Sequence, residues 1–200
     1  MEDWIFKYKL SLAIGGRGET MHSALQIMLQ NKGQIIAETG CQRMRDDWGA
    51  GSSTLVFGDF CKMFNKHLFT VDIDSRALTL SQEVIIEAGI PPEMITFVEN
   101  DSVAFLKGFN QQIDFLYLDS LDAHEYDGPE SLQAIQSQLH QLREIEAAYD
   151  KLAEHCVVLL DDNDPNSAFP NGGKTRLSKF FLKEKGFHLV LEGKQSLWQR

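Results

Sequence analysis

Short apolar runs alternate along the chain with longer segments in which apolar residues recur every three or four positions. The apolar runs are rich in Val, Ile, Leu and Phe, show little polar alternation, and occupy residues 34–38, 68–73, 95–98, 113–118 and 156–160. Strands of this composition are usually covered on both faces, as in a parallel sheet. Because helical segments separate them, the pattern predicts a doubly wound α/β sheet.

The helical segments carry start and stop signals. Asp74 and Ser75 can cap a helix that Gly89 is suited to end. Residues 129–155 predict one long helix, or two helices with a kink between them. Five apolar residues of this segment recur at helical spacing: Leu132, Ile135, Leu139, Leu142 and Ile145.

The last part of the chain departs from simple alternation. Residues 173–186 predict a helix that ends at Gly186. After it, the apolar runs 187–191 and 196–199 are separated by a short connection that contains a glycine, which is typical of a hairpin. We therefore expect a mostly parallel sheet of seven strands that finishes with a C-terminal antiparallel hairpin.

Composition narrows the class of protein. The 200 residues are 43% hydrophobic with no break in composition, which predicts a single domain over residues 1–200, with 1–33 as an N-terminal cap or substrate segment. A net charge of −10 argues against a nucleic-acid partner, and the lack of a long apolar run predicts a cytoplasmic protein without a membrane span. Cys41, Cys61 and Cys156 are predicted to be reduced. The sequence leaves oligomeric state open, a homo-oligomer included.

Polar residues follow the predicted strands at the edge where an open parallel sheet binds ligands, beyond its carboxyl ends. The first strand runs into Glu38 and Gly40, and the glycine-rich stretch "GAGSST" at 49–54 then leads into a helix. Glycines allow close approach to a ligand, and the start of a helix presents free N–H groups. The pattern suits a nucleotide-like or zwitterionic ligand, and an ordinary strand-to-helix turn is the alternative.

The second and third strands end in acidic and hydroxyl side chains. Asp72 in "VDID" is placed to accept hydrogen bonds from ribose hydroxyl groups, whereas Asp74 is better suited to cap the next helix. Asp101 or Ser102 in "ENDS" can bond an adenine amino group or can serve only as a helix cap.

The ordered series "AETG…GAGSST", "VDID", "FVENDS", "IDFLYLDS" and "VVLLDDND" resembles the class I S-adenosylmethionine-dependent methyltransferases, over roughly residues 20–200. Within that class, "LDSLDAHEYDG" followed by "LLDDN" is most similar to the small O-methyltransferases that bind a divalent metal, the catechol O-methyltransferase type and related bacterial sugar and natural-product enzymes. The resemblance implies a Rossmann-like fold and methyl transfer from S-adenosylmethionine to a small hydroxylated substrate.

The resemblance also implies roles for individual residues. It places the cofactor against Glu38, Gly40, Gly51, Ser53, Asp72, Ile73, Asp101, Ser102 and Asp119. It implies that Asp119, Asp162 and Asn163 hold a hard cation such as Mg²⁺. Such a cation would bind the substrate hydroxyl, lower its pKa and direct the oxygen towards the sulfonium methyl group.

The chain departs from the family pattern in two places. The stretch "CQRMRDDW" at 41–48 is an insertion, and its Arg43, Arg45 and Trp48 predict either part of a lid or a solvated loop. The catechol-type enzymes have a catalytic lysine where this chain has Asp122. His124 is the nearest titratable substitute as a catalytic base beside Asp119, and the alternative is a solvent-exposed loop histidine.

Other interpretations stay open at this level. The "DDND" stretch can form a hydrogen-bonded turn without a metal, and Asp161 rather than Asp162 can face the site. The "GGRG" stretch at 15–18 predicts a flexible connection before a helix near Thr20. A cofactor-binding protein without turnover and a nicotinamide-dependent oxidoreductase are the alternative functions, although the tight G-x-G-x-x-G turn of the latter is absent.

Overall fold

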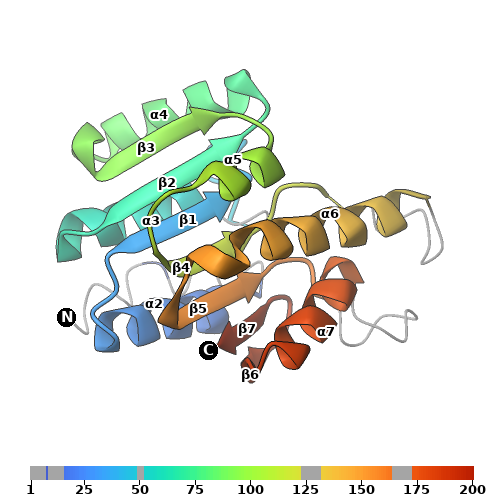
Figure 1. Cartoon of the computed structure of the whole chain (residues 1–200). Coiled ribbons are helices and arrows are strands. Elements are labelled where there is room, and N and C mark those ends of the chain that lie inside the picture. The colour runs from blue at the N-terminus through green and yellow to red at the C-terminus, as the bar shows by residue number, and fades with distance from the viewer. Residues whose placement is uncertain (1–7, 9–15, 49–51, 123–131, 164–172) are drawn as a thin grey trace.

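The computed structural model describes residues 8, 16–48, 52–122, 132–163 and 173–200, and these build a single sheet with helices on both faces (Figure 1). The strands are β1 Ile35–Thr39, β2 His67–Asp72, β3 Ile95–Glu99, β4 Ile113–Leu118, β5 Leu152–Leu160, β6 His188–Glu192 and β7 Ser196–Gln199. Their order is β3-β2-β1-β4-β5-β7-β6. Strands β1 to β5 are parallel, and β7 pairs antiparallel with both β5 and β6. The predicted sheet and its terminal hairpin are confirmed.

Helices cover the sheet in two layers. The α-helices are α2 Gly18–Gln30, α3 Ser53–Phe64, α4 Ser75–Glu87, α5 Ser102–Gly108, α6 Leu132–Ala148 and α7 Arg176–Glu184, and the 3-10 turns are η1 Pro92–Met94, η3 Tyr149–Lys151 and η4 Gly173–Thr175. Helices α2, α3 and α4 lie behind the sheet in Figure 1, and α5, α6 and α7 lie in front of it. Among the described residues, no helix is both long and apolar enough to cross a bilayer.

The core behind the sheet fixes a polar side chain at its rim. Phe57 of α3 is fully buried and packs edge-on against Phe115 and Tyr117 of β4, with ring centroids 5.2 and 5.4 Å apart. Such aromatic pairs hold their rings in a defined orientation. The orientation of the Tyr117 ring is therefore fixed, and its hydroxyl group lies at the carboxyl end of the sheet, beside Asp161.

One prediction about the segment before β5 is wrong. Residues 152–155 belong to β5 rather than to the preceding helix, and the pairing of β5 with β4 shifts register between Ile113 and Phe115. Three of the apolar residues at helical spacing on α6 face outwards: Leu132, Ile135 and Leu139 are exposed by 72%, 45% and 39%.

The buried face of α6 is polar instead. Its buried residues are Ala134, Ser137, Gln138, Gln141, Glu144, Ile145 and Ala148. Gln141 donates to the backbone carbonyls of Leu118 and Asp161, and Glu144 accepts from Ser120. Because these groups at the ends of β4 and β5 need buried partners, α6 turns its polar face to them rather than its leucines.

Strand β1 lies at the point where the strand order reverses, with β2 on one side and β4 on the other. Its last residue leads into Gly40, whose φ is +81° and whose amide donates to the Val71 carbonyl at 2.9 Å. A side chain at Gly40 would collide with the backbone carbonyl oxygen of Asp119. Only glycine permits this close approach of the ends of β1 and β4.

We predict that Gly40→Ala lowers the free energy of unfolding by about 2 to 4 kcal/mol, because the alanine combines a left-handed backbone with a backbone clash. The measurement is urea unfolding followed by circular dichroism. Gly108→Ala is the matched control, since nothing lies within 4 Å of its added carbon atom. Equal stability of the two variants would contradict the close packing at Gly40.

Candidate functional site

Two adjoining cavities open at the carboxyl ends of β1, β2 and β4. The larger has a volume of about 480 Å³ and the smaller about 230 Å³. Both are lined by Gly40, Asp72, Ile73 and Ser120, so they form one continuous depression at the reversal of strand order. Clefts at this position of a doubly wound sheet are where ligands bind.

Asp72 stands at the boundary between the two cavities. One of its carboxylate oxygens accepts from the Cys41 amide at 3.0 Å, and the other accepts from the Asp74 amide at 2.8 Å. These bonds fix the plane of the carboxylate and leave each oxygen a further lone pair. Asp74 caps α4 through the Arg76 amide, as expected from the sequence.

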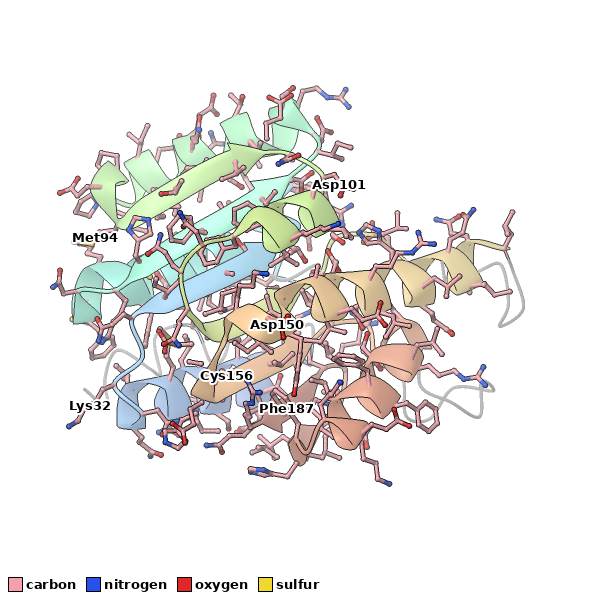
Figure 2. All side chains as sticks on the ribbon, viewed as in Figure 1. Lys32, Met94, Asp101, Asp150, Cys156 and Phe187 are labelled. Carbon is pink, nitrogen blue, oxygen red and sulfur yellow. The ribbon has the colours of Figure 1, made fainter. Side chains whose placement is uncertain are left out.

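Asp101 and Ser102 both line the smaller cavity, at the start of α5. Figure 2 shows Asp101 at the rim formed by the carboxyl ends of the strands, whereas Met94 lies at the opposite edge. The Asp101 carboxylate caps α5 by accepting from the Ala104 amide at 2.8 Å, and the Ser102 hydroxyl lies 3.0 Å from His140 Nε2. The cap predicted as an alternative is therefore present at the edge of a cavity.

Glu38 of β1 is not among the residues that line either cavity. It is fully buried, and its Oε2 accepts from the hydroxyl groups of Thr54 and Thr70 at 2.8 and 2.7 Å. Burial raises the pKa of Glu38 to about 7. Ser53 lines the larger cavity at the start of α3, and Gly51 lies outside the described residues.

The 41–48 segment forms one wall of the larger cavity. Arg43 pairs with Asp122 at 2.6 Å, so it spans from the end of β1 to the end of β4. Arg45 pairs with Glu83 at 2.7 Å on α4, and the Trp48 ring packs on Tyr8. The segment therefore contacts Asp122, α4 and Tyr8, while the Arg43 and Arg45 side chains are themselves exposed to solvent.

Asp161 is fully buried at the end of β5 and faces Arg17, which is 5% exposed. The Arg17 Nε donates to both carboxylate oxygens of Asp161, at 3.1 and 2.8 Å, and the Tyr117 hydroxyl donates to one of them at 2.7 Å. Although burial opposes it, Arg17 holds the pKa of Asp161 below its usual range. Arg17 is thus a fixed partner of β5 and not part of a flexible connection.

Asp119 lines the larger cavity at the end of β4, and both of its oxygens have hydrogen-bond donors beside them. Lys174 Nζ donates to Oδ1 at 3.1 Å, and the Tyr117 hydroxyl, whose single proton has its shorter contact with Asp161, lies 3.2 Å from Oδ2. Burial raises the pKa of Asp119 well above its usual value, and the nearby Asp161 carboxylate raises it further. Lys174 is buried as well, and Asp119 and Asp162 together keep its pKa raised against the effect of burial.

Asp162, rather than Asp161, joins Asp119 in an acidic cluster. The ligand atoms of Asp119, Asp122 and Asp162 lie within 4.8 Å of one another. Asn163 does not turn towards this cluster. Its Oδ1 accepts from the Thr175 hydroxyl at 2.8 Å and from Lys179 at 3.0 Å, and its Nδ2 donates to a hairpin carbonyl at 2.7 Å.

The arrangement of this cluster does not fit a bound divalent cation. Mg²⁺ requires close to six oxygen ligands in octahedral geometry. Here Lys174 Nζ already lies between Asp119 and Asp162, at 3.1 and 3.3 Å, and Asp122 is paired with Arg43. The oxygen atoms that would coordinate the ion are thus engaged by cations of the protein itself.

Several groups of the site carry no clear signal in the sequence. Arg17 lies between glycines and Lys174 follows a glycine pair, so both look like surface turn residues. Tyr117 reads as one more apolar position of a strand. His124, predicted as a base, lies outside the described residues.

His140 and Glu144 form an ion pair on α6 beside the smaller cavity, with His140 Nε2 3.5 Å from Glu144 Oε1. Glu144 also accepts from the Ser120 hydroxyl at 2.7 Å. The hydrogen bond to Glu144 raises the pKa of His140 above its ordinary value. Burial opposes the ionised form of Glu144, but the contact with His140 leaves its pKa below the ordinary value.

These shifts predict a pH-dependent stability. The contribution of His140 to the free energy of unfolding is fully present below its unfolded pKa. It is lost as the pH rises through its raised folded pKa. The contribution of Glu144 is present above its unfolded pKa and is lost as the pH falls through its lowered folded pKa. Both contributions to stability are therefore present between about pH 4.3 and 6.5, the unfolded pKa values of glutamate and histidine.

We expect Glu144→Gln to cost about 1 to 2 kcal/mol within this window and less at higher pH, because His140 then loses its proton. Urea unfolding at several pH values measures the difference, and NMR titration of His140 should give a lower pKa in the variant. Glu146→Gln, at an exposed position of the same helix, is the control. A pH-independent difference would contradict the ion pair.

Solved structures resemble the chain at low sequence identity. A methyltransferase from Podospora anserina, PaMTH1, with bound S-adenosylhomocysteine, has a TM-score of 0.62 and 13% identity, over 100% of this chain and 88% of its own. A Staphylococcus aureus protein provisionally assigned as a caffeoyl-CoA O-methyltransferase has a TM-score of 0.58 and 11% identity, over 88% and 79%. An rRNA methylase from Streptococcus thermophilus has a TM-score of 0.56 and 11% identity, over 90% of this chain and 96% of its own. They show that the chain has the Rossmann-like methyltransferase fold.

No curated protein matches the chain closely in sequence. A family described as a methyltransferase domain matches residues 48–163, which is more than half of the chain. The matched region runs from the wall of the larger cavity through the ends of β2, β4 and β5. The chain therefore belongs to this methyltransferase domain family, and it is a class I S-adenosylmethionine-dependent methyltransferase that resembles the small O-methyltransferases.

Proposed function

We propose that the chain transfers a methyl group from S-adenosylmethionine to a hydroxyl group of a small acceptor molecule. The observation that carries the proposal is the position of Asp119. Its carboxylate lines the larger cavity beside Gly40 and Asp72, at the reversal of strand order. A proton-accepting group is thus placed next to the depression that suits the cofactor.

The two cavities suit the parts of the cofactor in turn. The Asp72 carboxylate, fixed at their boundary, is oriented to accept hydrogen bonds from the two ribose hydroxyl groups. The smaller cavity, with Asp101 and Ser102 at its edge, suits the adenine. The larger cavity, with Gly40 and Ser53, suits the methionine portion, and Ile73 borders both.

When bound, S-adenosylmethionine supplies an electrophilic methyl group. In the proposed reaction Asp119 would accept the proton that the acceptor hydroxyl loses as its oxygen takes the methyl group, and S-adenosylhomocysteine would be the leaving group. Burial raises the pKa of Asp119 above its usual value, which makes its carboxylate a stronger base than that of an exposed aspartate. Lys174 donates to one carboxylate oxygen, and the Tyr117 hydroxyl lies beside the other.

The net charge of −10 supports a small acceptor rather than a nucleic acid, because phosphate backbones are bound by clustered Lys and Arg. Residues of the 41–48 segment line the larger cavity together with Asp119, so a small acceptor would bind between them and the proposed base. We propose that residues 1–33 and 41–48 contribute to binding of the acceptor molecule.

We predict that Asp72→Asn weakens S-adenosylhomocysteine binding at least about tenfold, because the charge that the ribose hydroxyls bind is removed. Isothermal calorimetry gives the affinity. Glu99→Gln is the matched control, because Glu99 pairs with Asp72 in the adjacent strand but lines neither cavity. An unchanged affinity in Asp72→Asn, or tighter binding of NAD than of S-adenosylhomocysteine, would contradict the proposed cofactor site.

Methyl transfer itself is tested with labelled S-adenosylmethionine and separate panels of catechols, sugars and RNA. We expect a hydroxylated small molecule to gain the label. Asp119→Asn should lower kcat about 10²- to 10⁴-fold, the usual contribution of a general base, with a smaller effect on cofactor affinity. Asp150→Asn, an exposed carboxylate, is the control. Labelling of RNA alone, or full activity of Asp119→Asn, would overturn the proposal.

A further inference from the structure

We infer that Lys174 takes the place that the sequence assigns to a divalent cation, so that this methyltransferase organises its acidic strand ends with its own ammonium group and binds no catalytic metal. The inference deepens the proposed function, but its central measurement does not depend on methyl transfer. It concerns Lys174 as a positioning residue, acting through Asp119.

Charge balance is the first support. Among the described residues, the cluster of Asp119, Asp122 and Asp162 and the neighbouring Asp161 are paired with the cationic side chains of Arg17, Arg43, Lys174 and Lys194. Each of these carboxyl groups thus already has a cationic side chain of the protein as its partner. A divalent ion would bring two further positive charges to carboxylates that are already neutralised, whereas metal sites of this kind depend on excess negative charge.

The position of Lys174 is the second support. Its side chain is 1% exposed, and its ammonium nitrogen lies 3.1 Å from Asp119 Oδ1 and 3.3 Å from Asp162 Oδ2. A buried ammonium group is retained only where charged partners compensate the loss of hydration. Lys174 therefore occupies the space between the two carboxylates as a fixed element of the fold.

The surrounding backbone keeps Lys174 there. Its amide donates to the Asp162 carbonyl at 3.1 Å, and the hydroxyl of the next residue, Thr175, donates to Asn163 Oδ1. The third residue expected to bind the metal, Asn163, is thus used to attach the turn that carries Lys174. The residues that the sequence assigns to a metal site thus hold Lys174 in place instead.

The test measures divalent-metal binding to the whole chain, with Mn²⁺ and Mg²⁺ as probes in isothermal calorimetry and thermal unfolding. We expect the unmodified protein to show no saturable binding and no rise in Tm. In Lys174→Met the ammonium is lost while the length of the side chain is nearly kept. This variant should bind Mn²⁺ at least about tenfold more tightly than the unmodified protein does.

Lys179→Met is the matched control, because Lys179 contacts Asn163 and Glu192 but not Asp119 or Asp162. It should gain no affinity for either metal. If Lys174→Met is unfolded without metal, the inference requires that Mg²⁺ or Mn²⁺ restore its native circular dichroism. A folded variant without metal affinity, an unfolded variant without rescue, or saturable binding by the unmodified protein would each overturn the inference.

An activity measurement separates this inference from the proposed function. If an acceptor is methylated, EDTA should leave the turnover of the unmodified protein unchanged, and a loss of turnover that Mg²⁺ restores would overturn the inference. If no acceptor is methylated and S-adenosylhomocysteine does not bind, the proposed function fails. The metal-binding comparison between Lys174→Met and Lys179→Met would still decide the role of Lys174.

Discussion

The site depends on the neutralisation of carboxylates that the fold buries at the ends of β4 and β5. An ionised carboxylate in a protein interior is tolerated only beside cations and hydrogen-bond donors. Arg17 forms an ion pair with Asp161, and Lys174 forms ion pairs with Asp119 and Asp162. These contacts tie α2 and the turn before α7 to the rim of the sheet, so the same interactions that stabilise the fold also orient the proposed catalytic carboxylate.

The polar face of α6 follows from the same constraint. At the ends of β4 and β5, the backbone carbonyls of Leu118 and Asp161 accept from Gln141, and the Ser120 hydroxyl donates to Glu144. The helix consequently exposes Leu132 and Ile135, which a purely hydrophobic rule would bury. Hydrogen bonding of these polar groups decides which face of α6 is buried, because an unpaired buried polar group costs about 1 to 3 kcal/mol.

Much of the architecture could be predicted from the sequence because its signals are local. Apolar runs without alternation gave the parallel strands, and a glycine-containing connection gave the terminal hairpin. Asp74 as a helix cap and Asp72 at the strand end depend only on neighbouring residues. The start of β5 was missed because its first residues pair with β4 beyond a register shift, which leaves no trace in hydrophobic periodicity.

The sequence by itself determined the doubly wound sheet, the rim at which polar residues gather and the likeness to methyltransferases, since each follows from periodicity and from the order of short motifs. Only the tertiary structure decided what those polar residues do. Asp161 meets an arginine 144 positions away, Asp119 meets a lysine 55 positions away, and Asn163 turns to the hairpin. Electrostatic partners of buried charges are set by how distant segments pack, and no local pattern encodes that choice.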